Sequence, residues 1–197
     1  MNGFFRFVWR VFGPVFRFFH PLAVTGLEKL PPHGALLCPN HSSNWDPVLL
    51  AITTPMDYHL RIMAKEELFK IPVLKQIVTK LGAFPVSRGN SDIHAVKTAI
   101  RAVKEGENLL IFPEGTRVDY EGQYQAKSGV AVIAVRTGAV MVPVFVDGKK
   151  KLFRRTRIIF GEPVKPVYTG RHGTAEEMQG ISDMVLRRAY ELGRAER

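Results

Sequence analysis

The sequence contains one cysteine, Cys38, among its 197 residues. A single thiol excludes a disulfide within the chain and a cysteine-based zinc cluster, and it is typical of proteins from a reducing compartment. Cys38 ends an apolar run, residues 35–38, which predicts a buried strand with Cys38 as a small core residue. The alternative is a nucleophile three residues before His41, and the apolar surroundings disfavour it.

Several catalytic signatures are also missing. The chain has no Gly-x-Ser-x-Gly, no Gly-x4-Gly-Lys, no His-Glu-x-x-His and no Gly-x-Gly-x-x-Gly. Serine hydrolases, nucleotide phosphotransferases, zinc proteases and dinucleotide enzymes therefore lack their usual sequence support. A hydrophobic content of 46% over a length suited to one domain argues against disorder.

Acidic residues are missing where basic residues gather. The first 27 residues hold Arg6, Arg10 and Arg17 and no acid, and six lysines and arginines lie within 149–157. Without these nine residues the net charge of +10 disappears, leaving 19 basic residues against 18 acidic ones. Two basic patches of this kind attract anionic lipid, an acidic partner or nucleic acid.

The first of these patches lies in an amphipathic segment, residues 1–21. On a helical wheel its three arginines form a narrow stripe opposite a broad aromatic face, which is typical of a helix lying in the headgroup region of a bilayer. The alternative is a helix packed on the protein's own core. The segment is shorter than the roughly 20 apolar residues of a membrane span, and it lacks a signal-peptide cleavage site. We expect Pro14 to break the helix. The predicted membrane-contacting residues are Phe4, Phe5, Arg6, Trp9, Arg10, Phe12, Phe16 and Arg17.

Apolar runs alternate with helical patterns in residues 22–197. The expected strands are 35–38, 61–64, 83–86, 108–112, 140–146 and 157–160. The expected helices are 47–53, 73–81, 92–105, 129–137 and 174–192. This alternation predicts an α/β fold, a single domain with a mostly parallel mixed sheet flanked by helices. In such domains the chemistry lies in the loops beyond the carboxyl ends of the strands.

His41 and Asp46 are the strongest candidates for chemistry. Histidine moves protons near neutral pH, and a carboxylate can fix its tautomer and stabilise the imidazolium. Five residues correspond to about 140° on a helix, so the two side chains can meet only in a loop or at a helix entrance. The alternative is structural: Asp46-Pro47 is also a good N-cap and first-turn pair, with His41 in a turn.

Glycine and basic residues meet in three of the expected loops. Guanidinium groups bind phosphate bidentately, glycine permits close backbone approach, and a helix start adds amide donors. Each loop alone is equally compatible with a solvated arginine, and Glu114 with a role as ion-pair partner of Arg117. The three stretches are Ser87-Arg88-Gly89, Pro113-Glu114-Gly115-Thr116-Arg117 and Lys127-Ser128-Gly129.

Four blocks occur in order along the chain. They are Asn40-His41 with Asp46, Gly82-Ala83-Phe84-Pro85-Val86-Ser87-Arg88, Phe112-Pro113-Glu114-Gly115-Thr116-Arg117 and Val142-Pro143-Val144. In order and spacing they resemble the four blocks of the glycerolipid acyltransferases, over residues of about 22 to 163. Within that family the pattern is most similar to the members that acylate lysophosphatidic acid.

The resemblance implies a set of roles. His41 would be the general base and Asp46 its orienting partner, with transfer of a fatty acyl group from acyl-CoA or acyl-carrier protein to the sn-2 hydroxyl of lysophosphatidic acid. Pro143 would shape the acyl-donor side. Direct attack without an acyl-enzyme, and without a metal or redox cofactor, is expected. The acceptor phosphate would be bound around Arg88, Glu114, Gly115, Thr116, Arg117 and Lys127.

The implied partners are lysophosphatidic acid, the acyl thioester and the membrane surface, with the chain on the cytoplasmic face as a peripheral or monotopic protein. For the patch at 149–157 a solvated hairpin, anionic phospholipid and acyl-carrier protein remain open. Nucleic acid is disfavoured because no aromatic stacking pattern accompanies the basic residues. Three rival functions also remain open: a lipid-binding protein without catalysis, an acyltransferase with another acceptor such as glycerol 3-phosphate, and a hydrolase.

Overall fold

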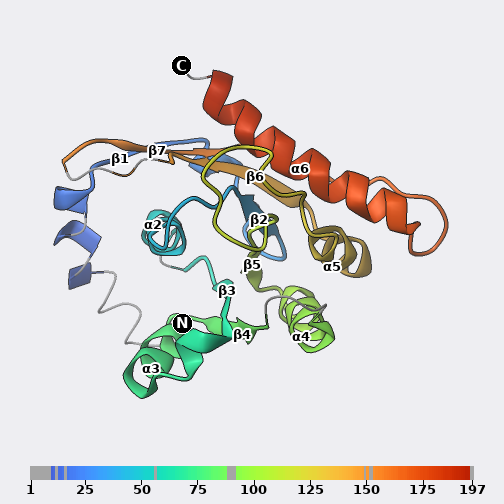
Figure 1. Ribbon diagram of the computed structural model, residues 1–197, viewed down its shortest axis with the longest axis horizontal. Helices are drawn as coiled ribbons and strands as arrows, with labels where there is room; N and C mark the ends of the chain where they lie inside the picture. Colours follow the sequence, from blue (N-terminus) through green and yellow to red (C-terminus); the bar gives the residue numbers. More distant parts are fainter. Residues whose placement is uncertain are drawn as a thin grey trace.

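The computed structural model describes residues 10–11, 13–15, 17–55, 57–87, 92–148, 150 and 153–195. Within these ranges seven strands form one sheet in the order β1-β7-β6-β2-β5-β3-β4. Every neighbouring pair is parallel except β6 and β7, which run antiparallel. The α/β fold with a mostly parallel mixed sheet is therefore confirmed (Figure 1).

The expected strands and helices appear with small shifts at their ends. The strands are β1 (Leu22–Thr25), β2 (Leu36–Pro39), β3 (Leu60–Lys65), β4 (Ala83–Val86), β5 (Asn108–Leu110), β6 (Met141–Val146) and β7 (Thr156–Phe160). The helices are α2 (Asp46–Thr53), α3 (Pro72–Lys80), α4 (Ile93–Lys104), α5 (Gly129–Thr137) and α6 (Ala175–Ala195), with short 3₁₀ turns η1 (Leu27–Lys29) and η2 (Glu66–Phe69). Strand β1 and the two 3₁₀ turns were not expected from the sequence.

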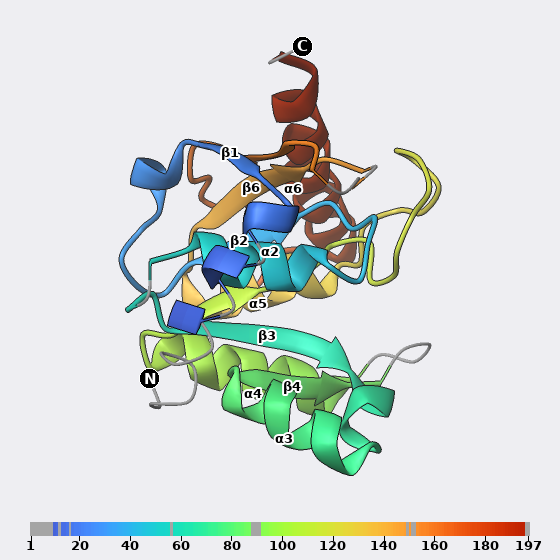
Figure 2. The same cartoon turned by 90° about the vertical axis from the view of Figure 1, so that its left-hand side faces the viewer.

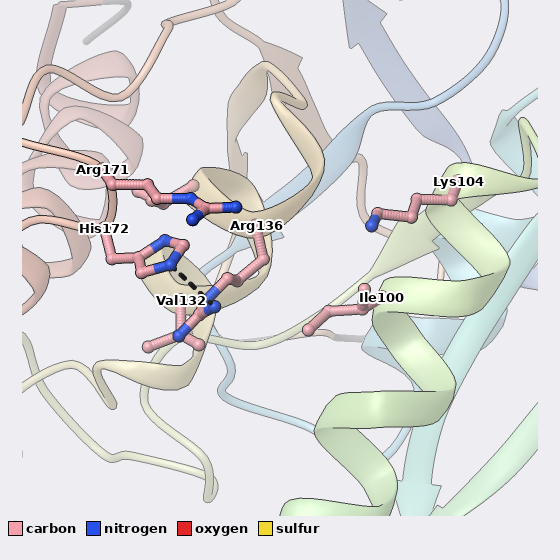
Figure 3. Close-up of a pocket in the computed structure, with 7 residues that line it drawn as sticks. Ile100, Lys104, Val132, Arg136, Arg171 and His172 are labelled. Carbon is pink, nitrogen blue, oxygen red and sulfur yellow. Dashed lines mark hydrogen bonds between the residues drawn. The ribbon is translucent and has the colours of Figure 1, made fainter.

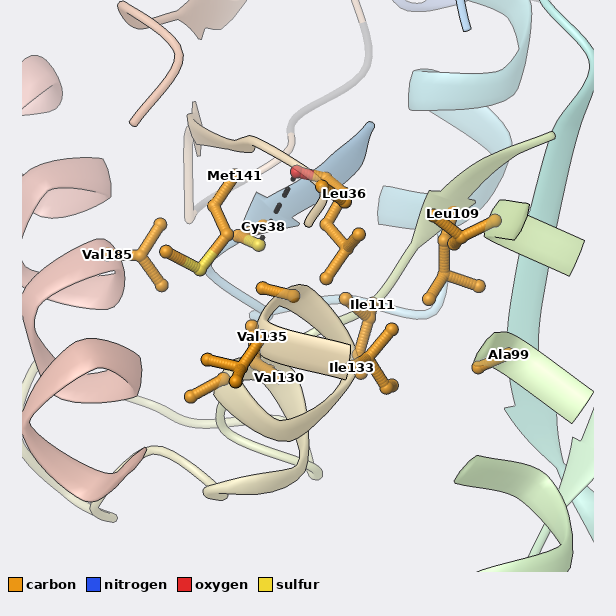
Figure 4. Close-up of a cluster of buried hydrophobic side chains, with 14 of the residues drawn as sticks. Leu36, Cys38, Ala99, Leu109, Ile111, Val130, Ile133, Val135, Met141 and Val185 are labelled. Carbon is orange, nitrogen blue, oxygen red and sulfur yellow. Dashed lines mark hydrogen bonds between the residues drawn. The ribbon is translucent and has the colours of Figure 1, made fainter. Parts of the chain in front are cut away.

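Strand β2 lies in the middle of the sheet, and all four of its residues are buried. Successive side chains of a strand point to opposite faces, so β2 feeds two cores. Leu36 and Cys38 join the cluster under α4, α5 and α6, where Met141 and Val185 also pack (Figure 4). Leu37 joins the opposite cluster, which contains residues of α2. Cys38 is fully buried, as expected for a core residue, and burial raises the pKa of its thiol.

The described residues of the N-terminal segment lie beside α2, where the Arg17 guanidinium donates to the Ile52 carbonyl at 2.8 Å (Figure 2). Its described residues 10–11, 13–15 and 17–19 are helical. Residues 12 and 16, on either side of Pro14, lie outside the described residues, so the break at Pro14 stays a prediction. Of the predicted membrane-contacting residues, Arg10 and Arg17 are described and exposed, whereas Phe4, Phe5, Arg6, Trp9, Phe12 and Phe16 lie outside the described residues. Among the described residues, no helix is both long and apolar enough to cross a membrane.

Candidate active site

His41 and Asp46 meet in the loop that connects β2 to α2. The Nδ1 atom of His41 lies 2.9 Å from Oδ2 of Asp46, and both side chains are buried. The His41 ring stacks on Phe112 at 3.9 Å between ring centroids, which fixes its plane. With Nδ1–H directed at the carboxylate, the tautomer that results carries its lone pair on Nε2. Nε2 makes no hydrogen bond within the described part of the chain.

The Asp46 carboxylate points back into the loop. Its Oδ2 accepts hydrogen bonds from the backbone N–H groups of Ser42 and Ser43, both at 2.7 Å, in addition to the His41 contact. Helix α2 begins at Asp46 with Trp45 as its N-cap residue and no side-chain capping bond. The alternative in which Asp46 caps the helix and His41 is merely a turn residue is therefore wrong. The carboxylate holds the loop and the imidazole together.

Lys150, from the β6–β7 connection, provides the other contact of Asp46. Its Nζ lies 2.5 Å from Asp46 Oδ1, and the two side chains are 4% and 0% exposed. Burial by itself would raise the pKa of Asp46, but the His41 hydrogen bond, the Lys150 ammonium and the Ser43 amide together hold it below its ordinary value. Sequence reasoning placed Lys150 only in a surface patch, because its partner lies 104 residues earlier in the chain.

The hydrogen bonds of the Asn40 side chain explain why the first block begins with asparagine. Its side chain donates from Nδ2 to the Val146 carbonyl at 3.0 Å and accepts the Val146 N–H on Oδ1 at 2.8 Å. These two bonds imitate a ladder pair beyond the last paired residue of β2, so they tie the start of the His41 loop to the end of β6. Asn40 is 3% exposed, which makes both bonds hard to replace with water.

Glu114 supports His41 from the other side. Its Oε2 accepts the backbone N–H of His41 at 2.6 Å, and its Oε1 accepts the Tyr190 hydroxyl of α6 at 2.5 Å. Glu114 is 2% exposed, and desolvation raises its pKa to about 7 despite these two bonds. Burial and the Glu114 charge also raise the pKa of Tyr190. The structure therefore supports neither the expected phosphate contact of Glu114 nor its alternative as an ion-pair partner of Arg117. No sequence signal pointed to Tyr190.

The other residues of the expected phosphate site lie partly on the loop that holds Glu114 and partly outside the described residues. Gly115 has a φ of +67°, and a Cβ there would lie 3.1 Å from Cγ of Lys127, so the Lys127 side chain covers this turn. Lys127 and Arg117 are exposed, and Thr116 is half-buried. The structure thus brings Gly115 and Lys127 together on the loop that holds Glu114. Arg88 lies outside the described residues, two positions after the end of β4.

Pro143 lies inside β6 rather than on an open surface. It pairs with Cys38 of β2, and its carbonyl accepts the Gly161 N–H at 2.9 Å. A Cβ on Gly161 would come within 2.9 Å of Pro143 Cγ, so the two residues pack tightly. Pro143 is therefore a buried part of the sheet beside β2.

The basic patch at 149–157 is not one surface. Lys150 is buried against Asp46, and Arg157 forms an ion pair with Asp147 at 2.9 Å. Arg154 and Arg155 are exposed, while Lys149 and Lys151 lie outside the described residues. A solvated hairpin is therefore the wrong description for Lys150 and Arg157.

Exposed aromatic side chains gather near the residue that starts α2. The Phe19 carbonyl accepts the Phe153 N–H at 2.8 Å, and the rings of Phe18, Phe19 and Phe153 contact one another. The ring centroid of Trp45, the residue directly before Asp46, lies 6.3 Å from that of His20. We call this set the aromatic surface; its exposed members are Phe18, Phe19, Trp45 and Phe153.

A separate hollow of about 600 Å³ lies between α4, α5 and the loop before α6 (Figure 3). It is lined by the cationic side chains of Lys104, Arg136 and Arg171 together with His172. Lys104 ends α4 and Arg136 lies in the last turn of α5, which places the hollow at the amino ends of the strands. It is therefore not part of the site around His41. No cluster of three metal-ligating side chains occurs in the described ranges.

Comparison with known proteins agrees with this geometry. The family model described as "Acyltransferase" matches residues 21–147. A 1-acyl-sn-glycerol-3-phosphate acyltransferase of Bacillus subtilis is 31% identical over 170 residues, which cover 84% of each chain. One from Streptococcus pneumoniae is 33% identical over 145 residues, covering 70% of this chain and 53% of the relative.

A solved structure shares the fold over almost the whole chain. The crystal structure of the 1-acyl-sn-glycerophosphate acyltransferase PlsC from Thermotoga maritima superimposes with a TM-score of 0.70 at 25% identity. The match covers 96% of this chain and 79% of that one. The chain is therefore an acyltransferase and belongs to the family of the 1-acyl-sn-glycerol-3-phosphate acyltransferases.

Proposed function

We propose that the protein transfers a fatty acyl group from an acyl thioester, acyl-CoA or acyl-carrier protein, to the sn-2 hydroxyl of 1-acyl-sn-glycerol 3-phosphate, giving phosphatidic acid. The observation that supports it best is the buried His41–Asp46 pair, whose Nδ1–Oδ2 distance of 2.9 Å leaves Nε2 unpaired among the described residues. The names of the relatives supply the substrate class.

In this proposal His41 is the general base. Nε2 takes the proton of the sn-2 hydroxyl as the hydroxyl oxygen attacks the thioester carbonyl carbon. The tetrahedral state then collapses, the carbon–sulfur bond breaks, and the leaving thiolate takes the proton back from Nε2. Asp46 stabilises the imidazolium between these steps. A positioned base of this kind contributes about 10²–10⁴-fold. The steps need no metal or redox cofactor.

In this proposal the acceptor lysophosphatidic acid is held by its phosphate and by its acyl chain. Arg117 and Lys127 are exposed on the loop that carries Gly115, and Arg88 is the third candidate from the sequence. Their charges would fix the phosphate and bring the hydroxyl to Nε2, which is a proximity contribution. The aromatic surface beside Trp45 would rest in the interface of an anionic membrane, where the acceptor and product reside. Peripheral attachment through residues 1–21 is part of the same proposal.

The test is thiol release from a long-chain acyl-CoA or acyl-carrier protein, with and without oleoyl-lysophosphatidic acid. We expect acceptor-dependent release with phosphatidic acid formed, and a loss of several hundredfold or more in kcat for His41→Ala. His59→Ala is the matched control, because His59 is exposed and lies in the connection before β3. Near-normal turnover by a folded His41→Ala protein would remove the general-base assignment.

A further inference from the structure

We propose that Lys150 is a positioning residue for this reaction: it keeps Asp46 ionised inside the protein and thereby leaves the His41–Asp46 pair free to accept the proton of the acceptor hydroxyl. The inference rests on the proposed function, since it assigns a role beside the same base. Lys150 lies six residues beyond Val144, the end of the fourth sequence block.

Three oxygens surround the ammonium group of Lys150. It donates hydrogen bonds to the Asp147 carbonyl at 2.6 Å and to Ser42 Oγ at 3.1 Å, and it forms an ion pair with Asp46 Oδ1 at 2.5 Å. The side chain is 4% exposed. A long basic side chain buried in this way is not a membrane or partner contact.

The two carboxylate oxygens of Asp46 make different contacts. Oδ2 accepts from the imidazole and from the amides of Ser42 and Ser43. Oδ1 receives no aligned hydrogen bond, and its contact is the close ion pair with Lys150. Burying one partner of such a pair without the other leaves an uncompensated charge, which is strongly unfavourable.

The charges around the pair show why this matters for catalysis. With His41 neutral, the Asp46 carboxylate and the Lys150 ammonium cancel. Glu114 lies on the β5–α5 loop, bonded to Tyr190, and adds negative charge once its carboxyl group ionises near pH 7, whereas Asp147 is paired with Arg157. If the ammonium were removed, the buried carboxylate would be compensated most easily by a proton on the pair itself. A pair that already holds that proton cannot act as a base.

The decisive measurement is the pH profile of kcat/KM from pH 5 to 9 for the wild type and Lys150→Met. We expect the acid limb of the variant to move up by at least about one pH unit, as expected for removing one charge within a few ångströms. On the acid limb kcat should then fall about tenfold, it should largely recover at pH 9, and KM for lysophosphatidic acid should change less than about twofold. A purely structural role would lower kcat equally at every pH. Lys165→Met, at an exposed lysine after β7, is the control.

An acid limb at the wild-type position in a folded Lys150→Met protein would overturn the proposal. Failure of the proposed function would look different, because the wild type itself would then release no thiol in response to the acceptor. Urea unfolding of Lys150→Met, Asp46→Asn and the double variant tests the pair without any activity. The double variant should be no less stable than Lys150→Met alone. If its loss in free energy of unfolding equals the sum of the two single losses, Lys150 and Asp46 do not act as a buried pair.

Discussion

Replacing Glu114 by glutamine should change how the stability of the protein depends on pH. Burial raises the pKa of Glu114 to about 7, compared with 4.5 for an ordinary glutamate. Since the folded state holds the proton more tightly than the unfolded state, the stability that Glu114 contributes is fully present at low pH and is lost as the pH rises through this window. At about 1.4 kcal/mol per pH unit, the difference corresponds to about 3 kcal/mol.

Glutamine has nearly the same shape, and its amide can still accept the His41 N–H and donate to the Tyr190 oxygen. The measurement is urea unfolding of both proteins between pH 5 and pH 8. We expect the Glu114→Gln protein to gain up to about 3 kcal/mol relative to the wild type as the pH rises across that range. Other titrating groups are common to both proteins and cancel in the difference. A stability difference that stays constant with pH would refute the reasoning.

Three further substitutions test other contacts. Asn40→Ala should cost about 2–4 kcal/mol in urea unfolding, because it leaves the buried N–H and carbonyl of one residue unpaired; unchanged stability would contradict the anchoring role. Tyr190→Phe should cost about 1.5–3 kcal/mol at pH 8 and less at pH 5, where its partner is protonated; an equal cost at both pH values would argue against a charge-assisted bond. The double substitution Trp45→Ser with Phe153→Ser should weaken sedimentation with anionic liposomes, whereas Val167→Ser, at an isolated and 85% exposed valine, should not; equal effects would contradict the aromatic surface.

The sequence was sufficient for most of the fold because its apolar runs are short and clearly separated. The strand around Cys38 was expected from four consecutive apolar or small residues, and it is the buried centre of the sheet. Strand β1 (Leu22–Thr25) was not expected; it is an edge strand, and its partner β7 begins at Thr156, far along the chain. Gly26 shows what local patterns miss: with φ of +74°, any Cβ there would lie 2.1 Å from the Phe160 carbonyl oxygen.

The sequence likewise predicted one part of the candidate site and missed another. His41 and Asp46 were identifiable because they lie in one loop, although local rules alone also allowed Asp46 to be a helix cap. The contact with Lys150 decides how Asp46 is charged, and it joins residues 104 positions apart. Glu114 was placed at the phosphate by the family resemblance, but its carboxylate faces inward to the His41 amide and to α6. Such long-range pairings leave no periodic signal in a single sequence.

The proline of the second block has a consequence for how copies of this chain can meet. Strand β4 is the last strand of the sheet in the described part of the chain, so its outer side has no strand partner there and is an edge that another strand could extend. Pro85 lies within this four-residue strand and is exposed. It has no N–H to donate to an added strand, and such prolines are a known protection of sheet edges. Pro85 therefore hinders two molecules at high concentration from pairing their β4 edges into one continuous intermolecular sheet.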